Sequence, residues 1–490
     1  MTPEVQVLVI GAGPAGLTMA AELARYGIKT RIVEKAAART DKSKALVVWS
    51  RTLELLDRAG CSRSFVAAGH QVVAANIVAG SKTIGHISLA GVDSPYPYAL
   101  MLPQSDTERL LEDHLAGLGV TVEREVEAAS FVQDESGVSV TLRHPDEHEE
   151  ILRTGWLIGC EGAHSLVRET LKLAFEGDTL PSEWILADLE LAGVPFPASE
   201  MALYWHEDGL LALFPITSVR YRLVANVEGS GAEHPPAPSL ADVQKVIETR
   251  GPRGMTASNP IWLSSFRINE RKVRDYRTGR VFVAGDAAHI HSPAGGQGMN
   301  TGMQDAINLA WKLALVCRGE AANHLLDSYS AERSAVGKQV LIESGRLTSV
   351  GVMKNHAGQA LRNLVAGLLL GLTPVRDAMA NDLSEIAVGY ADSPINGPQH
   401  GKAEFAPGKR LAPKHQGPPI GAGALPRFAV FAPSNAEVLA LIHQHPDLVE
   451  AAPRPPLESD AILLVRPDGY IAGGSGDVQT ISEYLTALRR

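Results

Sequence analysis

The sequence predicts an α/β fold with more than one domain. Three observations lead to this expectation. An apolar strand, a glycine-rich turn and a helix open the chain, a second strand followed by glycines lies past its midpoint, and residues 176–275 between them are rich in β-type runs. A chain of 490 residues also exceeds what one hydrophobic core usually supports. We expect a Rossmann-like domain interleaved with a β-sheet domain.

The first motif is G-x-G-x-x-G, directly after the apolar run 5–10. Gly11 allows a sharp turn, Gly13 allows the backbone to approach a pyrophosphate, and Gly16 allows the following helix to pack closely on the strand. A glycine triplet alone is a weak signal. With a strand before it and a helix after it, the triplet predicts a dinucleotide site.

The helix after this turn begins at about Pro14 and Ala15, so its positive dipole end faces the phosphates. A second apolar strand, residues 30–33, ends at Glu34 and Lys35. An acid at this spacing accepts hydrogen bonds from the ribose hydroxyls of an adenosine group. Its charge would repel a 2′-phosphate, so NADP is disfavoured at this site.

The second motif is a strand, residues 279–284, that ends in Gly285 and Asp286. A carboxylate there can accept a hydrogen bond from a sugar-alcohol hydroxyl, although an aspartate that only caps a helix is the alternative. Backbone N–H groups after it can face a developing negative charge. Reduced flavin carries such a charge, so one long cofactor, FAD, explains both motifs. The candidate contacts in the following glycine-rich loop are Gly296, Gly298, Met299 and Asn300.

Hydrophobic periodicity and Gly/Pro breaks predict the remaining elements. The tail beyond about residue 400 has a compact α/β pattern after Pro/Gly-rich linkers. We expect helices near 51–58 and 107–115, a long helical region from about 302 to 347, and strands within 72–100, 120–126, 137–142, 156–160 and 176–275.

Composition excludes several classes of protein. A net charge of −10 argues against a nucleic-acid partner. The three cysteines lie far apart, so we expect no metal site and a reducing, cytoplasmic location. The apolar run 364–372 is too short to span a bilayer. We expect it to be a buried helix, with a membrane-surface contact as the alternative.

Three motifs in this order resemble those of the FAD-dependent aromatic hydroxylases, the class A flavoprotein monooxygenases similar to para-hydroxybenzoate and phenol hydroxylases. They are the N-terminal glycines, the segment 161–168 (EGAHSLVR) and the Gly285–Asp286 run. The resemblance covers roughly residues 4–340 and extends to 329–333 (YSAER).

The resemblance implies roles for individual residues. Asp286 would contact the ribityl chain, Pro293 would border the isoalloxazine, Gln104 would contact the flavin, and the backbone of Val126 would meet the adenine. The middle motif, which begins at Glu161, would contribute to FAD and nicotinamide binding.

Two residues depart from the family pattern. Glu161 stands where the family usually has aspartate, and Arg168 remains available to pair with it in a shifted register. Lys44 stands where arginine is frequent in the family. Lysine keeps the positive charge but lacks the planar guanidinium group that makes two parallel hydrogen bonds. Lys44 is a candidate cofactor contact, with a solvated loop lysine as the alternative.

The family's reaction, implied by the resemblance, consumes NAD(P)H and O2. Reduced FAD forms a C4a-hydroperoxide that hydroxylates an aromatic substrate, here phenolic or of a polyketide or antibiotic type. No residue that activates the substrate can be named. Two alternatives are kept: a non-catalytic FAD-binding protein that sequesters a metabolite or drug, and a quinone-pathway hydroxylase at the membrane.

The resemblance also implies a domain division. The tail resembles a thioredoxin-like domain but lacks a C-x-x-C motif, which excludes thiol–disulfide chemistry. We expect no membrane partner and leave a homodimer open. The expected divisions are an FAD-binding domain of 1–70, 101–175 and 278–350, a substrate domain of 71–100 and 176–277, a helical connection of 351–400, and the thioredoxin-like domain of 401–490.

Overall fold

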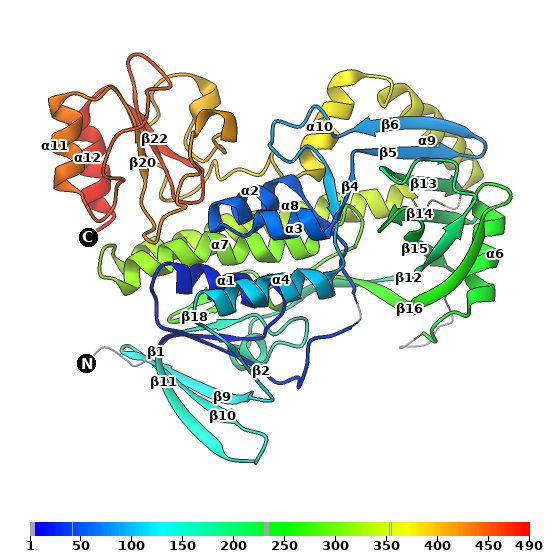
Figure 1. Ribbon diagram of the computed structural model, residues 1–490, viewed down its shortest axis with the longest axis horizontal. Helices are drawn as coiled ribbons and strands as arrows, with labels where there is room; N and C mark the ends of the chain where they lie inside the picture. Colours follow the sequence, from blue (N-terminus) through cyan, green and yellow to red (C-terminus); the bar gives the residue numbers. More distant parts are fainter. Residues whose placement is uncertain (1–4, 42, 230–234, 352, 354) are drawn as a thin grey trace.

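The computed structural model describes residues 5–41, 43–229, 235–351, 353 and 355–490. They form two eight-stranded sheets and two three-stranded sheets, flanked by helices. Figure 1 shows the first large sheet below helices α1, α4 and α7, the second large sheet beside it, and the C-terminal α/β unit at the opposite end. The expected mixed α/β fold is confirmed.

The first sheet has a parallel centre in the order β18-β11-β1-β2-β8. Its central strands are almost continuously apolar, as expected for strands covered on both faces. Antiparallel strands extend the sheet at β11 and β18. The strands are β1 (Val5–Ile10), β2 (Thr30–Glu34), β8 (Val122–Arg124), β9 (Glu127–Asp134), β10 (Gly137–Arg143), β11 (Glu149–Gly159), β17 (Arg277–Thr278) and β18 (Val281–Val283).

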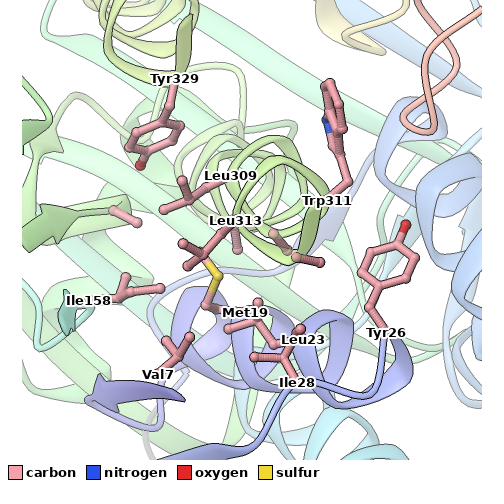
Figure 2. Close-up of a cluster of buried hydrophobic side chains, with 14 of the residues drawn as sticks. Val7, Met19, Leu23, Tyr26, Ile28, Ile158, Leu309, Trp311, Leu313 and Tyr329 are labelled. Carbon is pink, nitrogen blue, oxygen red and sulfur yellow. The ribbon is translucent and has the colours of Figure 1, made fainter. Parts of the chain in front are cut away.

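Helices α1 (Pro14–Arg25) and α7 (Gly298–Cys317) pack on this sheet and on each other. Figure 2 shows their apolar side chains meeting between the sheet and helix α8 (Asp327–Gly351). This core fixes the start of both helices relative to the strand ends. The labelled side chains are Val7, Met19, Leu23, Tyr26, Ile28, Ile158, Leu309, Trp311, Leu313 and Tyr329.

Further elements surround this core. Helix α4 (Gln104–Gly117) packs beside α1. A small antiparallel sheet has the order β3-β7-β4. The remaining elements of this part are β3 (Val47–Val48), α2 (Ser50–Ala59), α3 (Ser62–Ala68), β4 (His70–Val72), β7 (Ala99–Met101) and α5 (Leu166–Thr170).

The second large sheet has the order β19-β16-β12-β15-β14-β13-β5-β6. It is antiparallel except between β5 and β13. Strand β19 begins three residues after Asp286, so a short segment links this sheet to the end of β18. The strands are β5 (Ala74–Ala79), β6 (Lys82–Ser88), β12 (Glu176–Ala192), β13 (Glu200–His206), β14 (Gly209–Pro215), β15 (Arg220–Val227), β16 (Thr256–Lys272) and β19 (His289–Ile290).

The long helical region expected from about 302 to 347 is confirmed. It comprises two long helices, since α7 ends at Cys317 and α8 begins at Asp327, with Gly319 at φ +71° after the end of α7. Helix α6 (Leu240–Arg250) lies within the strand-rich region 176–275 and was not predicted. It begins with a capping box between Ser239 and Asp242 that the strand-rich surroundings obscured.

The expectation that residues 364–372 are buried is wrong. This run forms the end of helix α9 (His356–Leu369) and the turn before α10 (Thr373–Leu383). Helix α9 lies at the edge of the molecule against β6, and several of its leucines face outward (Figure 1). Leu370 is 6% exposed and packs over Gly85, whereas Leu364 and Leu368 are 62% and 66% exposed.

The C-terminal unit is a three-stranded antiparallel sheet with two helices. Its likeness to thioredoxin and the domain boundaries stay predictions. Trp311 of α7 stacks edge-on against Phe428 of this unit and donates a hydrogen bond to Asp468. Its elements are β20 (Ala429–Phe431), α11 (Ala436–Gln444), β21 (Ile462–Val465), β22 (Ile471–Ser475) and α12 (Val478–Ala487).

Candidate functional site

The carboxyl ends of the parallel strands meet at one edge of the first sheet. The register aligns Ile10 with Val33 and with Gly159, and Gly159 with Val283. Open α/β sheets bind ligands at this edge. The residues that follow these strand ends are the predicted site residues Gly11, Glu34, Glu161 and Gly285.

The N-terminal glycines have the geometry that a pyrophosphate cradle needs. Gly11 has a φ of +97°, and a methyl group on Gly16 would overlap the Gly11 carbonyl oxygen. A methyl group on Gly13 would meet open space, so bare backbone faces outward there. Pro14 occupies the first turn of α1, and the N-terminus of that helix points at the same place.

Glu34 is fixed beside this turn. Its Oε2 accepts the Ala12 N–H at 2.9 Å, and its Oε1 accepts the Ala36 N–H at 2.9 Å. Each carboxylate oxygen keeps a further lone pair. The Val126 N–H donates to the Glu34 carbonyl oxygen at 3.1 Å, although Val126 lies between β8 and β9 and not within a strand. Lys35 is exposed.

The two distant motifs lie against each other. A methyl group on Gly285, which has a φ of +60°, would lie 3.0 Å from the Ala15 Cβ. The neighbouring Asp286 side chain is exposed, yet enough protein surrounds it that desolvation raises its pKa, against the opposing effect of His289 and Lys44.

The helix-cap alternative for Asp286 is not supported. It lies inside a single 3-10 turn, Gly285–Ala287, whose N-terminus has no side-chain cap. Lys44 is exposed, but its charge acts on Asp286, so it faces the site. This segment is held from both sides: the Ala45 N–H donates to Gln104 Oε1 at 3.2 Å, and Arg222 donates to the Lys44 carbonyl oxygen at 3.1 Å.

The glycine loop, residues 293–298, is held by contacts that the sequence did not reveal. The Asn300 side chain donates to the carbonyl oxygens of Val47 and Gly296 at 2.9 and 3.0 Å, and it accepts the Trp49 N–H at 2.9 Å. The Trp49 indole donates to the Gly295 carbonyl oxygen at 2.9 Å. The apolar run at 45–49 was the one available signal for these partners.

In this loop Pro293 is exposed, and Gly296, Gly298 and Met299 are half-buried. Gly296 lies close to Val47, because a methyl group on it would approach the Val47 Cγ2 to 3.1 Å. Helix α7 begins at Gly298, so its first N–H groups face the same side as the loop.

The middle motif is built differently from the paired acid and arginine considered above. Glu161 Oε1 accepts the Ser165 hydroxyl and the Val167 N–H, both at 2.8 Å. Burial raises the pKa of Glu161, and its buried Oε2 has no hydrogen-bond partner among residues the structure describes. Arg168 instead donates to the carbonyl oxygens of Ala163 and Ala287 at 2.7 and 3.3 Å.

A second buried carboxyl lies behind the start of α7. Glu385, whose φ is +61°, accepts hydrogen bonds from Gln304 Nε2 at 2.5 Å and from the Thr301 hydroxyl at 3.4 Å. Burial raises the pKa of Glu385 to about 8. Sequence analysis did not single out this residue.

A phosphate cradle, an acid beside it and an accessible carboxylate beyond it suit a long dinucleotide cofactor. A family model described as an FAD binding domain matches residues 4–344. The chain belongs to this FAD-binding family. FAD is therefore its cofactor, as expected. The roles of individual residues toward FAD stay predictions.

Named relatives extend this assignment. The chain is 37% identical over 423 residues to 6-methylpretetramide 4-monooxygenase of Streptomyces rimosus, which covers 84% of this chain and 75% of the relative. It is 35% identical over 365 residues to rifampicin monooxygenase of Streptomyces venezuelae, covering 74% and 75%. The protein is an FAD-dependent monooxygenase, which disfavours the non-catalytic alternative.

A solved structure agrees over the whole chain. The anhydrotetracycline hydroxylase of Streptomyces rimosus superimposes with a TM-score of 0.79 at 28% identity, covering 99% of this chain and 98% of that one. In the described residues, each helix is too short or too polar to span a bilayer.

Proposed function

We propose that the enzyme hydroxylates a polycyclic phenolic substrate of the polyketide type, with NAD(P)H and O2 as co-substrates. The observation that carries the proposal is a cluster of apolar side chains that reaches from the glycine loop into the second sheet. Two relatives, 37% and 35% identical over the aligned residues, are named for 6-methylpretetramide and for rifampicin.

The apolar cluster spans three parts of the molecule. It joins Val47 and Trp49 beside the glycine loop to strands of the second sheet and to α10. Trp205 and Phe214 are half-buried and pack against it. Its other members include Ala75, Ile77, Ile87, Leu203, Met379 and Leu383.

The proposed FAD contacts follow from the site. The glycine turn and the N-terminus of α1 would bind the pyrophosphate, Glu34 the ribose, and Asp286 the ribityl chain. When bound, FAD supplies the oxygen-activating chemistry that side chains lack. The chain's own residues bind the cofactor, orient the ring system and exclude water. The full set of proposed contacts is Gly11, Gly13, Pro14, Ala15, Gly16, Glu34, Lys35, Lys44, Gln104, Val126, Glu161, Asp286, Pro293, Gly296, Gly298, Met299 and Asn300.

The test compares two faces of the same sheet. Trp205→Leu removes a ring from the apolar cluster beside the glycine loop. Phe196→Leu removes a half-buried ring from the apolar cluster on the other face of the sheet. NAD(P)H oxidation is measured with tetracyclic and naphthalene-type phenols, and product mass is followed. We expect substrate-stimulated oxidation and a gain of one oxygen atom.

Trp205→Leu should raise KM for the ring substrate at least about fivefold, and Phe196→Leu should leave it within about twofold, because one lost aromatic contact costs about 1 kcal/mol. FAD affinity should be unchanged in both variants. If protein loaded with FAD oxidised no phenol of the panel, the proposal would be wrong.

A further inference from the structure

A buried ion pair lies behind the Gly285–Asp286 turn and is not part of any predicted contact with the cofactor. Asp305 of α7 and Arg333 of α8 are both 0% exposed, and Arg333 Nε donates to Asp305 Oδ1 at 2.6 Å. An ion pair this deep requires that the remaining donors and acceptors be satisfied. The other hydrogen bonds of Asp305 and Arg333 show which segments this ion pair holds in place.

Asp305 binds the turn itself. Its Oδ2 accepts the Gly285 N–H at 3.1 Å and the His289 Nε2–H at 2.8 Å. These two residues flank Asp286, one before it and one three positions after it. The carboxylate of Asp305 therefore fixes both sides of the residue proposed to meet the ribityl chain.

Arg333 binds the start of α7. Its Nη2 donates to the Thr301 carbonyl oxygen at 3.1 Å, one residue beyond Asn300, and its Nη1 donates to the Tyr390 hydroxyl at 3.1 Å. The two segments that face the ribityl chain and the flavin ring are thus tied to one ion pair. Tyr390 in turn packs on Tyr470 of the C-terminal unit, with ring centroids 4.4 Å apart.

Packing leaves the turn little room to shift toward its neighbours. A methyl group on Gly302 of α7 would lie 3.1 Å from the Gly285 Cα, and one on Gly285 would lie 3.0 Å from the Ala15 Cβ. Sterics restrain the turn from α1 and α7, and the hydrogen bond from Gly285 to Asp305 restrains its backbone direction.

We infer that Asp305 and Arg333 are positioning residues that hold the Gly285–Asp286 turn and the first turn of α7 in register for the ribityl–flavin end of FAD. The inference rests on the cofactor of the proposed function and not on its substrate. The nucleotide end, at Gly11–Gly16 and Glu34, has no bond to this pair. A defect in the pair should therefore weaken FAD and spare adenosine nucleotides.

The test titrates apo-protein with FAD and, separately, with ADP as a probe of the nucleotide end. Asp305→Asn removes the charge and leaves Arg333 unpaired. The double variant Asp305→Asn with Arg333→Met removes both charges, which guards against a fold lost to one buried charge. Both should bind FAD at least about tenfold more weakly, since lost bonds to charged groups cost this much or more. ADP affinity should stay within about twofold.

The matched control is Glu22→Gln, which breaks another buried pair, with Arg58, between α1 and α2. It should lower the melting temperature without moving FAD affinity. Wild-type FAD affinity in the Asp305 variants would overturn the inference, as would a parallel loss of ADP binding or an equal loss of FAD affinity in Glu22→Gln. These titrations contain no phenol, so a failed substrate panel leaves their result intact.

Discussion

At the scale of single residues, the sequence predicts the role of a residue when the contacts behind that role are local in the chain. The glycine triplet is predictable because part of its packing is local, as the contact of Gly16 with the Gly11 carbonyl oxygen shows. Asn300 and Asp305 are different, because their partners Trp49 and Arg333 come from other elements. Their roles depend on tertiary contacts that periodicity does not encode.

Two glycines of the same motif should fail in different ways when changed to alanine. Gly16→Ala places a methyl group on the Gly11 carbonyl oxygen, so the apo-protein should lose about 1–3 kcal/mol of unfolding free energy or fail to fold. Gly13→Ala meets open space, so apo stability should change by less than about 0.5 kcal/mol while FAD binding weakens. Urea unfolding and FAD titration measure both. Equal destabilisation by the two changes would contradict the packing described for Gly16.

Glu385 gives stability a pH dependence of known sign. Its pKa rises from 4.5 to about 8 on folding, so the folded state holds a proton that the unfolded state releases. Stability from this group is full below about pH 4.5 and declines as the pH rises toward 8, by up to about 1 kcal/mol per pH unit. Glu385→Gln should remove that decline. The check is the difference in unfolding free energy between the two proteins from pH 5 to 8, and a flat difference would refute it.

At the scale of elements, the sequence predicts helices and strands that have a strong hydrophobic periodicity. It does not predict which other elements cover their faces. The expected helices near 51–58 and 107–115 correspond to α2 and α4. The run 364–372 is apolar enough for a core, but which faces of a helix are covered depends on where β6 and the sheet edge lie. Apolar composition alone could not place α9 at the surface.

Because one face of α9 is exposed, we expect polar substitutions of its leucines to change stability little. Replacing Leu364 and Leu368 together with glutamine should cost less than about 0.5 kcal/mol, because both are more than 60% exposed. Leu370→Gln, a few residues away and 6% exposed, should cost about 2–4 kcal/mol, because it buries an amide without partners. Thermal unfolding of the two variants provides the comparison. A large loss from the exposed pair would mean that this face is covered in solution.

At the scale of the whole molecule, the parallel order of strands predicts where the site lies once the pairing is known. The attachment of the C-terminal unit was not predictable, because it uses buried charges. Glu332 accepts hydrogen bonds from Lys312 at 2.7 Å and from both terminal nitrogens of Arg466 at 2.7 and 3.0 Å, with all three side chains 0% exposed.

This buried cluster should make the C-terminal unit inseparable from the rest. Arg466→Met leaves Glu332 and Asp468 without their shared partner and should cost about 3–5 kcal/mol. Arg489→Ala breaks a partly exposed pair with Asp447 in the same unit and should cost less than about 1 kcal/mol. Calorimetry should show a single transition in the wild type. Little change in the Arg466 variant would show that the charges do not hold the units together.

The strand order also determines when, during translation, the candidate site can form. β1 pairs with β2 and β11, and the turn at Gly285 is held by Asp305, whose partner Arg333 is translated later still. A nascent chain that has left the ribosome only as far as Gly16 has the glycine turn without the later strands and helices that flank it. The candidate site is therefore complete only after most of the chain has been translated.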